Sequence, residues 1–204
     1  MTGHLEVEVK FLLGDLAGFR ERLAAAGAVV TAPRIYERNL RLDTPEQGLL
    51  ARRQLLRLRQ DTAVRLTFKG EVPEAAFSEA KVYEELEVGV SDWETAVLLF
   101  RRLGFAPVQI YEKYRETFAW QDVEIVLDEL PYGDFVELEG EEAALKTAAA
   151  TLGLDWSRRI TTNYLALMAQ LKNHHNLPFD DLTFANFQTT PARAADALPQ
   201  GYGD

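Results

Sequence analysis

Acidic and basic residues recur at every second position in three β-prone segments of this chain. The segments are Glu6-Val7-Glu8-Val9-Lys10, Lys113-Tyr114-Arg115 and Phe135-Val136-Glu137-Leu138-Glu139. A β-strand projects alternate side chains to one face, so each segment forms a charged stripe. Paired carboxylates are good ligands for hard cations such as Mg²⁺ or Mn²⁺, and Lys-x-Arg pairs suit phosphate oxygens. The stripes therefore predict a metal-assisted site for phosphate chemistry.

The composition narrows the class of protein. A length of 204 residues with 47% hydrophobic content fits one domain with a substantial core. There is no cysteine, so disulfides are excluded and any metal ligands are expected to be oxygens. The formal net charge of −10 disfavours a broad nucleic-acid surface. No apolar run approaches the roughly 20 residues of a membrane span, and no signal-peptide pattern opens the chain, so we expect a cytoplasmic protein without membrane contact.

Hydrophobic periodicity predicts a mixed set of strands and helices. Alternation predicts eight strands, over Leu5–Leu13, Ile35–Leu42, Leu55–Arg59, Val64–Gly70, Glu79–Val90, Val108–Trp120, Val123–Glu129 and Phe135–Glu139. Helical spacing predicts four helices, over Asp15–Ala26, Ser91–Leu103, Glu141–Leu152 and Ser157–Asn173. A capping-box spacing is expected to open the second of these helices at Ser91. From Asn176 the pattern fades, and Thr189–Asp204 is predicted to be a mobile tail.

The residues of the predicted strands separate into two faces. One face is apolar, and the other collects Arg57, Arg59, Arg65, Lys69, Lys81, Glu85, Glu87, Lys113, Arg115, Glu124, Asp128, Glu137 and Glu139 with Glu6, Glu8 and Lys10. One interpretation is an ordinary half-exposed antiparallel sheet with a wet polar face. The other is an α+β fold in which an eight-stranded antiparallel closed β-barrel surrounds a charged lumen and the helices pack outside. The repeated Glu-x-Glu and Arg-x-Arg pairs favour the closed barrel.

The charged segments also occur in a family-like order along the chain. The N-terminal Glu-x-Glu-x-Lys stretch resembles the signature of the CYTH domain, the triphosphate tunnel metalloenzymes that include class IV adenylate cyclases and thiamine triphosphatases. Further landmarks are similar to successive family strands: Asp43-Thr44-Pro45, Leu56-Arg57-Leu58-Arg59, Thr67-Phe68-Lys69-Gly70, Glu85-Leu86-Glu87, Lys113-Tyr114-Arg115, Leu127-Asp128-Glu129 and Phe135–Glu139. The resemblance covers roughly residues 4–170. It implies a tunnel, dependence on a divalent metal and a triphosphate-bearing substrate.

Roles follow for individual residues. The predicted metal ligands, for Mg²⁺ or Mn²⁺, are Glu6, Glu8, Asp128, Glu137 and Glu139. The predicted catalytic residues are Glu6, Glu8 and Lys10. The predicted substrate-binding residues are Lys10, Arg57, Arg59, Lys69, Glu85, Glu87, Lys113, Arg115 and Arg159. For any one carboxylate the alternative is an internal salt bridge, and for the outer cations it is pairing with Glu85 or Glu87.

Three functions remain open at this point. We favour metal-dependent hydrolysis of inorganic triphosphate or of an organic or nucleoside triphosphate, because hydrolysis needs only a phosphate cradle and a positioned water. The alternative is a class IV-type adenylate cyclase that converts ATP to cyclic AMP and pyrophosphate, although the sequence shows no adenine reader. The third is a polyphosphate-binding module without catalysis. We expect a tunnel domain over residues 1–175, an extension over 176–204 and a small-molecule triphosphate as partner, and we leave a homodimer open.

Overall fold

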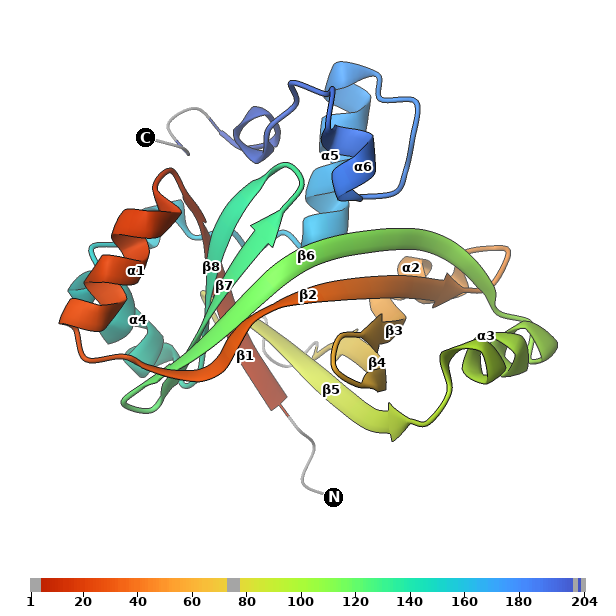
Figure 1. Cartoon of the computed structure of the whole chain (residues 1–204), viewed down its shortest axis with the longest axis horizontal. Helices are drawn as coiled ribbons and strands as arrows, with labels where there is room; N and C mark the ends of the chain where they lie inside the picture. Colours follow the sequence, from red (N-terminus) through yellow and green to blue (C-terminus); the bar gives the residue numbers. More distant parts are fainter. Residues whose placement is uncertain (1–4, 73–77, 200–201, 203–204) are drawn as a thin grey trace.

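Eight strands form one closed antiparallel sheet in the computed structural model, which describes residues 5–72, 78–199 and 202 (Figure 1). Their order around the barrel is β1-β5-β4-β3-β2-β6-β7-β8. The strands are β1 (Leu5–Leu13), β2 (Val29–Asp43), β3 (Gln54–Gln60), β4 (Val64–Glu71), β5 (Lys81–Val90), β6 (Ala106–Trp120), β7 (Val123–Leu130) and β8 (Gly133–Glu139). The predicted eight-stranded barrel with helices outside is confirmed.

Strand β1 closes the ring because it pairs on both sides. In its register with β8, Lys10 lies opposite Glu137 and Glu8 opposite Glu139, whereas in its register with β5 Glu8 lies opposite Lys81. Closure joins the first and last strands of the ring, so neither is left as a free edge strand. It also turns the charged face of every strand toward a common interior, because side chains alternate between the two faces of a sheet.

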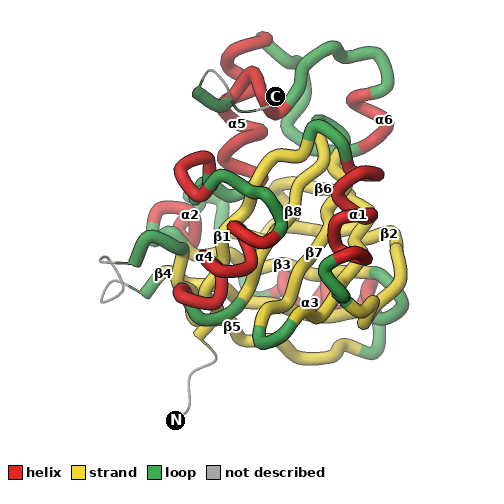
Figure 2. The backbone as a smooth tube through the Cα atoms, turned by 90° about the vertical axis from the view of Figure 1, so that its left-hand side faces the viewer, coloured by secondary structure: helices red, strands yellow, loops and turns green. Residues whose placement is uncertain are grey.

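The apolar face of the barrel is covered by helices on one side (Figure 2). Helices α1 (Leu16–Ala25) and α4 (Glu142–Thr151) cover the outer face of β1, β7 and β8. Phe19 and Leu23 of α1 and Leu145 of α4 share a buried cluster with Val9 and Leu138. Helix α3 (Trp93–Arg102) packs on the outer faces of β2 and β3 in a smaller cluster. The helices thus bury the apolar side chains that point outward from the strands.

The C-terminal elements pack on a third cluster above β6 and the β7–β8 hairpin (Figure 1). They are α5 (Tyr164–His175), α6 (Phe184–Phe187) and a short 3₁₀ helix, η3 (Ala194–Ala197). Another 3₁₀ helix, η2 (Trp156–Arg158), packs through Trp156 on the cluster of α1 and α4, and a further short helix, α2 (Gly48–Ala51), follows β2. Leu182 forms a parallel bridge with Tyr111 of β6 and is fully buried. The described part of the predicted tail therefore packs against the barrel, while residues 200, 201, 203 and 204 of that tail lie outside the described residues.

Several element boundaries differ from the sequence predictions, and three of these differences have a clear physical reason. The helix predicted over Ser157–Asn173 is wrong in its first part, because residues 159–163 leave helical geometry and Ile160 bridges to the β1 backbone. Helix α3 is capped by Asp92, whose carboxylate accepts the Thr95 N–H at 2.7 Å, and not by Ser91. Strand β2 begins at Val29, before its predicted start at Ile35, because it pairs with the long strand β6. Bulges shift the register of this pairing without ending it. Tertiary pairing decided the first and third of these boundaries.

No helix in the described ranges combines the length and the apolar character needed to span a membrane.

The burial of Leu182 provides a test of the C-terminal packing. Replacing Leu182 by Ala removes a fully buried side chain from the third cluster, so the free energy of unfolding should fall by about 2–5 kcal/mol. The matched control is Leu103→Ala, which truncates a largely exposed leucine and should change the free energy by no more than about 0.5 kcal/mol. Urea unfolding followed by circular dichroism measures both, and equal effects would show that the segment is not packed.

Candidate active site in the barrel lumen

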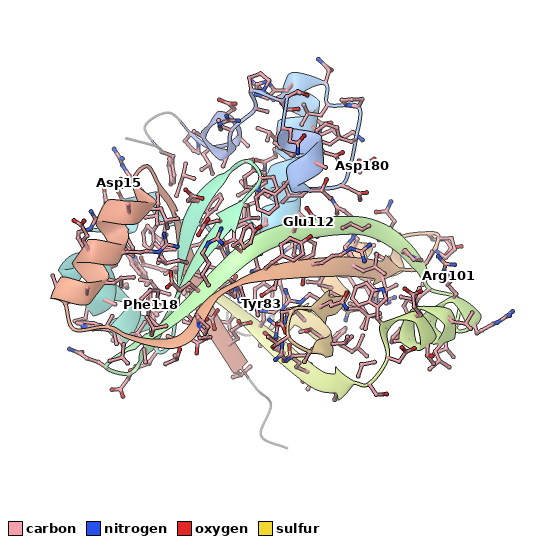
Figure 3. All side chains as sticks on the ribbon, in the orientation of Figure 1. Asp15, Tyr83, Arg101, Glu112, Phe118 and Asp180 are labelled. Carbon is pink, nitrogen blue, oxygen red and sulfur yellow. The ribbon has the colours of Figure 1, made fainter. Side chains whose placement is uncertain are left out.

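The barrel encloses a cavity of about 910 Å³. Its wall combines charged residues of the lumen, including Glu8, Lys10 and Lys113, with residues of α5 and of the segment around α2. Tyr83 of β5 also lines the cavity and lies near the centre of the molecule (Figure 3). The charged stripes predicted from sequence therefore face one enclosed space of the size that small-molecule ligands occupy.

Three carboxylates gather on the β1–β8 side of this space. Ligand oxygens of Glu6, Glu8 and Glu139 lie within 4.8 Å of one another. Burial, opposed by the nearby Lys69, raises the pKa of Glu6 to about 8. Burial, opposed by Arg115, likewise raises the pKa of Glu139 to about 7. Burial alone would raise the pKa of Glu8 as well, but Lys10 and Lys69 together outweigh it and lower that pKa.

The donor set of these three residues fits a divalent metal of the hard class. All three ligands are carboxylate oxygens, which Mg²⁺ and Mn²⁺ prefer over nitrogen or sulfur donors. The pKa values of Glu6 and Glu139 are raised mainly by burial, with a smaller contribution from neighbouring carboxylates, so a bound cation would favour the ionised forms of both groups. Glu6, Glu8 and Glu139 are thus the residues that could hold the ion.

The other two predicted metal ligands lie among cations. Asp128 accepts hydrogen bonds from Lys113 at 2.9 Å and from Arg115 at 2.8 and 2.6 Å. Glu137 accepts one from Arg115 at 2.6 Å and lies 3.4 Å from the Lys10 ammonium. Both carboxylates are buried. In this structure they hold lysine and arginine side chains in place, and their role as metal ligands stays a prediction.

Lys10 and Lys113 are the most enclosed cations of the site. Each is almost fully buried and forms ion pairs with carboxylates, Lys10 with Glu8 and Glu137 and Lys113 with Asp128. The Lys10 ammonium lies 3.1 Å from Glu8 and 3.4 Å from Glu137. Together these two carboxylates outweigh the effect of burial and raise the pKa of Lys10. Since an ammonium group has three donors, contacts with one or two carboxylates leave room for a phosphate oxygen.

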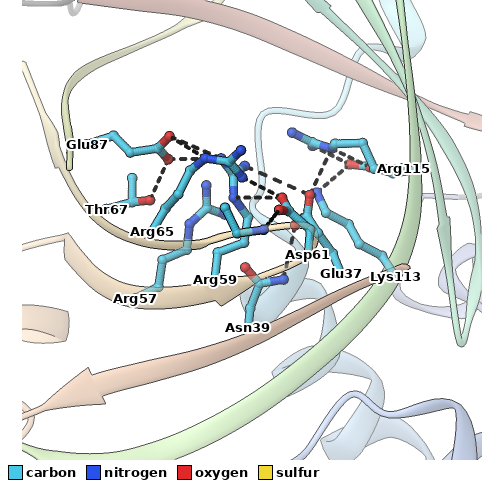
Figure 4. Close-up of polar contacts among 12 residues, drawn as sticks. Glu37, Asn39, Arg57, Arg59, Asp61, Arg65, Thr67, Glu87, Lys113 and Arg115 are labelled. Carbon is cyan, nitrogen blue, oxygen red and sulfur yellow. Dashed lines mark hydrogen bonds and ion pairs between the residues drawn. The ribbon is translucent and has the colours of Figure 1, made fainter. Parts of the chain in front are cut away.

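Strands β3, β4 and β5 contribute a second set of charged side chains to the lumen (Figure 4). Arg59 donates to Glu87 at 3.0 Å, and Thr67 donates to the same carboxylate at 2.9 Å. Lys69 forms ion pairs with Glu6 and, at 2.7 Å, with Glu85. The structure therefore supports the pairing of the outer cations with Glu85 and Glu87 that the sequence left open.

Several buried polar atoms of strands β2 and β3 have no hydrogen-bond partner among the described residues. They are Nε of Arg41, Arg57 and Arg59 and Oδ1 of Asn39. Arg57 is buried, and its Nη1 donates to the Tyr111 hydroxyl at 3.0 Å, but its Nε has nothing to donate to. Buried donors are normally paired. Arg41 and Arg57 are also among the residues that line the cavity.

Arg159 lies apart from the charged residues that line the cavity. Its guanidinium donates to the backbone carbonyls of Glu79 and Trp156 at 2.9 and 3.0 Å and stacks on the Trp156 ring. It precedes α5 rather than starting a helix, and it does not belong to the wall of the cavity. Its predicted substrate contact therefore has no geometric support.

Strand β2 supplies functional residues that the sequence analysis did not assign. Glu37 is buried, and although burial would raise its pKa, Lys113 and Arg115 bring it down to about 2. Asn39 donates to Glu37 at 3.2 Å, and Arg41 lines the cavity. The signal was present in the sequence, because Glu37, Asn39 and Arg41 alternate in the same way as the assigned charged stripes.

Comparisons with known proteins agree with this geometry. A family model for the CYTH domain matches residues 4–158. The chain is 31% identical to adenylate cyclase CyaB of Aeromonas hydrophila over 182 residues, which cover 82% of this chain and 91% of the relative. A conserved hypothetical protein from Pyrococcus furiosus has a similar structure, with 26% identity, a TM-score of 0.65 and coverage of 78% of this chain and 97% of that chain.

A more distant structure shares the fold. It is a candidate adenylyl cyclase from Hippeastrum described as having a dominant triphosphatase activity. It is 15% identical, with a TM-score of 0.56 and coverage of 78% of this chain and 90% of that chain.

The raised pKa values of Glu6 and Glu139 predict how the metal-free protein responds to pH. A carboxyl group whose pKa is higher in the folded than in the unfolded protein stabilises the fold at pH values below its unfolded pKa. That contribution is lost as the pH rises from about 4.5 through the folded values of about 7 and 8. The thermal midpoint in chelator should therefore fall between pH 6 and pH 9. Glu6→Gln should fall less steeply, because its amide cannot ionise.

The control for this measurement is Glu21→Gln, which changes an exposed glutamate of α1 and should follow the parent protein at every pH. Parallel curves for Glu6→Gln and the parent would contradict the assigned ionisation of Glu6.

Proposed function

This chain belongs to the CYTH domain family, and on that premise we propose that it cleaves the triphosphate chain of an organic triphosphate by divalent-metal-dependent hydrolysis. One observation carries the proposal: the buried cations line the same cavity as Glu8 and Glu139, two of the three clustered carboxylates. Cations alone would suit any small anion, and carboxylates alone would suit any hard cation. Together they suit a polyphosphate bound with a divalent ion.

The cations that line the cavity would bind the phosphate oxygens. Lys10, Lys69 and Lys113 offer point charges from three different strands, and Arg57 offers an unpartnered buried N–H. Because these groups are already fixed by carboxylates, little reorganisation is needed when negative charge develops on the departing phosphate. The residues thus orient the chain and stabilise the leaving group.

The carboxylate cluster would hold the metal. When bound by Glu6, Glu8 and Glu139, a divalent ion polarises phosphate oxygens and activates water. Lys10 lies between Glu8 and Glu137, so it stands at the border between the carboxylates and the phosphate-binding cations. This position is suited to a phosphate oxygen that contacts both halves of the site.

The size and chemistry of the cavity favour an organic substituent on the triphosphate. On the α5 side the wall includes Leu50, Leu55, Val108 and Leu165, which give it an apolar character that inorganic triphosphate would not use. Apolar walls of this kind hold ligand groups by removing their surface from water. The substituent would lie against α5 and the segment around α2, with the phosphates directed into the lumen.

Cyclisation of ATP is a second candidate because of the relationship to adenylate cyclase CyaB, which extends over 91% of that protein. In that reaction the ribose 3′-hydroxyl attacks the α-phosphorus and pyrophosphate leaves. The same cations would stabilise the departing pyrophosphate. The apolar wall is compatible with a nucleoside, so both reactions fit one bound substrate.

Product analysis separates the two reactions. Purified protein should release phosphate and ADP from ATP if it is a hydrolase, or cyclic AMP and pyrophosphate if it is a cyclase. Either activity should disappear in chelator and return with Mg²⁺ or Mn²⁺, because the candidate metal ligands are all carboxylates. Glu8→Gln should lower turnover at limiting metal. Undiminished turnover in chelator would contradict the metal role, and absence of turnover on all triphosphates would contradict catalysis.

Binding can be tested without turnover. Inorganic triphosphate should raise the thermal midpoint of the metal-free protein, since it binds only the folded state. Arg57→Ala and Lys113→Ala should each weaken this binding by about 1.5–3 kcal/mol, the range for hydrogen bonds to charged groups. Arg102→Ala, which removes an exposed cation of α3, is the matched control. Sulfate at equal ionic strength controls for general anion effects, and an equal midpoint gain with sulfate would argue against a triphosphate site.

A further inference from the structure

The chain beyond the region matched by the CYTH model returns to the lumen at the start of α5. Residues 159–163 are not helical, and the Ile160 N–H donates to the Lys10 carbonyl at 2.7 Å. Asn163 then caps α5, because its side-chain oxygen accepts the Ala166 N–H at 2.8 Å. Tyr164 is the first residue of the helix. The backbone of a central lumen residue, Lys10, thus fixes where this helix begins.

Tyr164 contacts three charged groups of the site. Its hydroxyl donates to Oδ2 of Asp128 at 3.1 Å. The Lys10 and Lys113 ammonium nitrogens lie 5.3 and 5.6 Å from the centre of its ring. Both distances are within the range of cation–π attraction, which strengthens where water is excluded. One buried side chain therefore contacts two phosphate-binding cations and the carboxylate that holds one of them.

Neighbouring residues also fix the orientation of the Tyr164 side chain. The Phe135 ring packs edge-on at 5.0 Å, and Asn163 caps the helix at the preceding residue. With its ring packed and its helix capped in this way, the Tyr164 hydroxyl points toward Asp128. Fixed supporting groups of this kind commonly tune the residues that touch ligand and metal.

We propose that Tyr164 is a positioning residue of the triphosphate site: its hydroxyl orients Asp128, and its ring holds the Lys10 and Lys113 ammonium groups toward the cavity. This inference rests on the proposed function. Asp128 in turn accepts hydrogen bonds from Lys113 and Arg115, so a change at Tyr164 alters the position of both cations through one carboxylate. The site is therefore complete only with the segment that follows residue 158.

Tyr132 provides a matched comparison within the same cluster. It is fully buried, as Tyr164 nearly is, and its hydroxyl makes one hydrogen bond, but that bond ends on a backbone carbonyl. Tyr132→Phe and Tyr164→Phe each delete one buried hydroxyl, so a purely structural role predicts similar losses in thermal midpoint and similar kinetics. A positioning role predicts that only Tyr164→Phe affects substrate.

The experiment combines calorimetric titration of inorganic triphosphate into metal-free protein with steady-state kinetics on ATP in Mn²⁺. Tyr164→Phe should bind triphosphate more weakly and lose about tenfold or more in kcat/KM, as supporting residues of such sites do. Tyr164→Leu, which also removes the ring from Lys10 and Lys113, should lose more. Tyr132→Phe should stay within about twofold of the parent in both measurements, at a midpoint close to that of Tyr164→Phe.

Parent-like binding and kcat/KM for Tyr164→Phe would overturn the inference. So would an equal loss in Tyr132→Phe, because a general loosening of the cluster would then explain both. If the parent protein itself bound no triphosphate, the proposed function would fail first, and the inference with it. Comparison of the parent with the variants therefore tells the two failures apart.

Discussion

Lys10 and Lys113 carry their charges in a space almost closed to water, and a buried ammonium group is stable only where carboxylates compensate it. Glu8 and Glu137 compensate Lys10, and Asp128 compensates Lys113. Glu8 lies on the same strand as Lys10, and Asp128 meets Lys113 across the β6–β7 pair, but Glu137 meets Lys10 only because β1 pairs with β8 and closes the barrel. Closure of the sheet and charge balance in the lumen thus depend on each other.

The balance is local, and its uneven places indicate what the lumen binds. Glu8 and Glu139 lie directly opposite each other, as do Arg41 and Arg57, and opposed like charges destabilise a sheet. The acidic pair belongs to the cluster suited to a cation, and the basic pair has unpartnered N–H groups suited to an anion. A polyphosphate with a divalent ion would satisfy both places at once, which a simple anion could not do.

Much of the barrel could be predicted from the sequence because strand residues alternate with a period of two, and charged stripes such as Glu6 to Lys10 mark the inner face. What failed depended on tertiary contacts. The bridge from Ile160 to Lys10 interrupts a segment whose local pattern is helical. The contact of Tyr164 with Asp128 could not be assigned because the two residues are far apart in the chain, and no local pattern links them.

The central claim is that one lumen holds the metal on its carboxylate side and the triphosphate on its cationic side. The most direct measurement is anomalous scattering from a crystal of the protein grown with Mn²⁺ and a triphosphate analogue that resists cleavage. We expect a manganese peak among Glu6, Glu8 and Glu139, with phosphate density extending toward Lys10, Lys113 and Arg57. A manganese peak elsewhere, or phosphate density on the outer surface of the barrel with the lumen filled only by water, would contradict it.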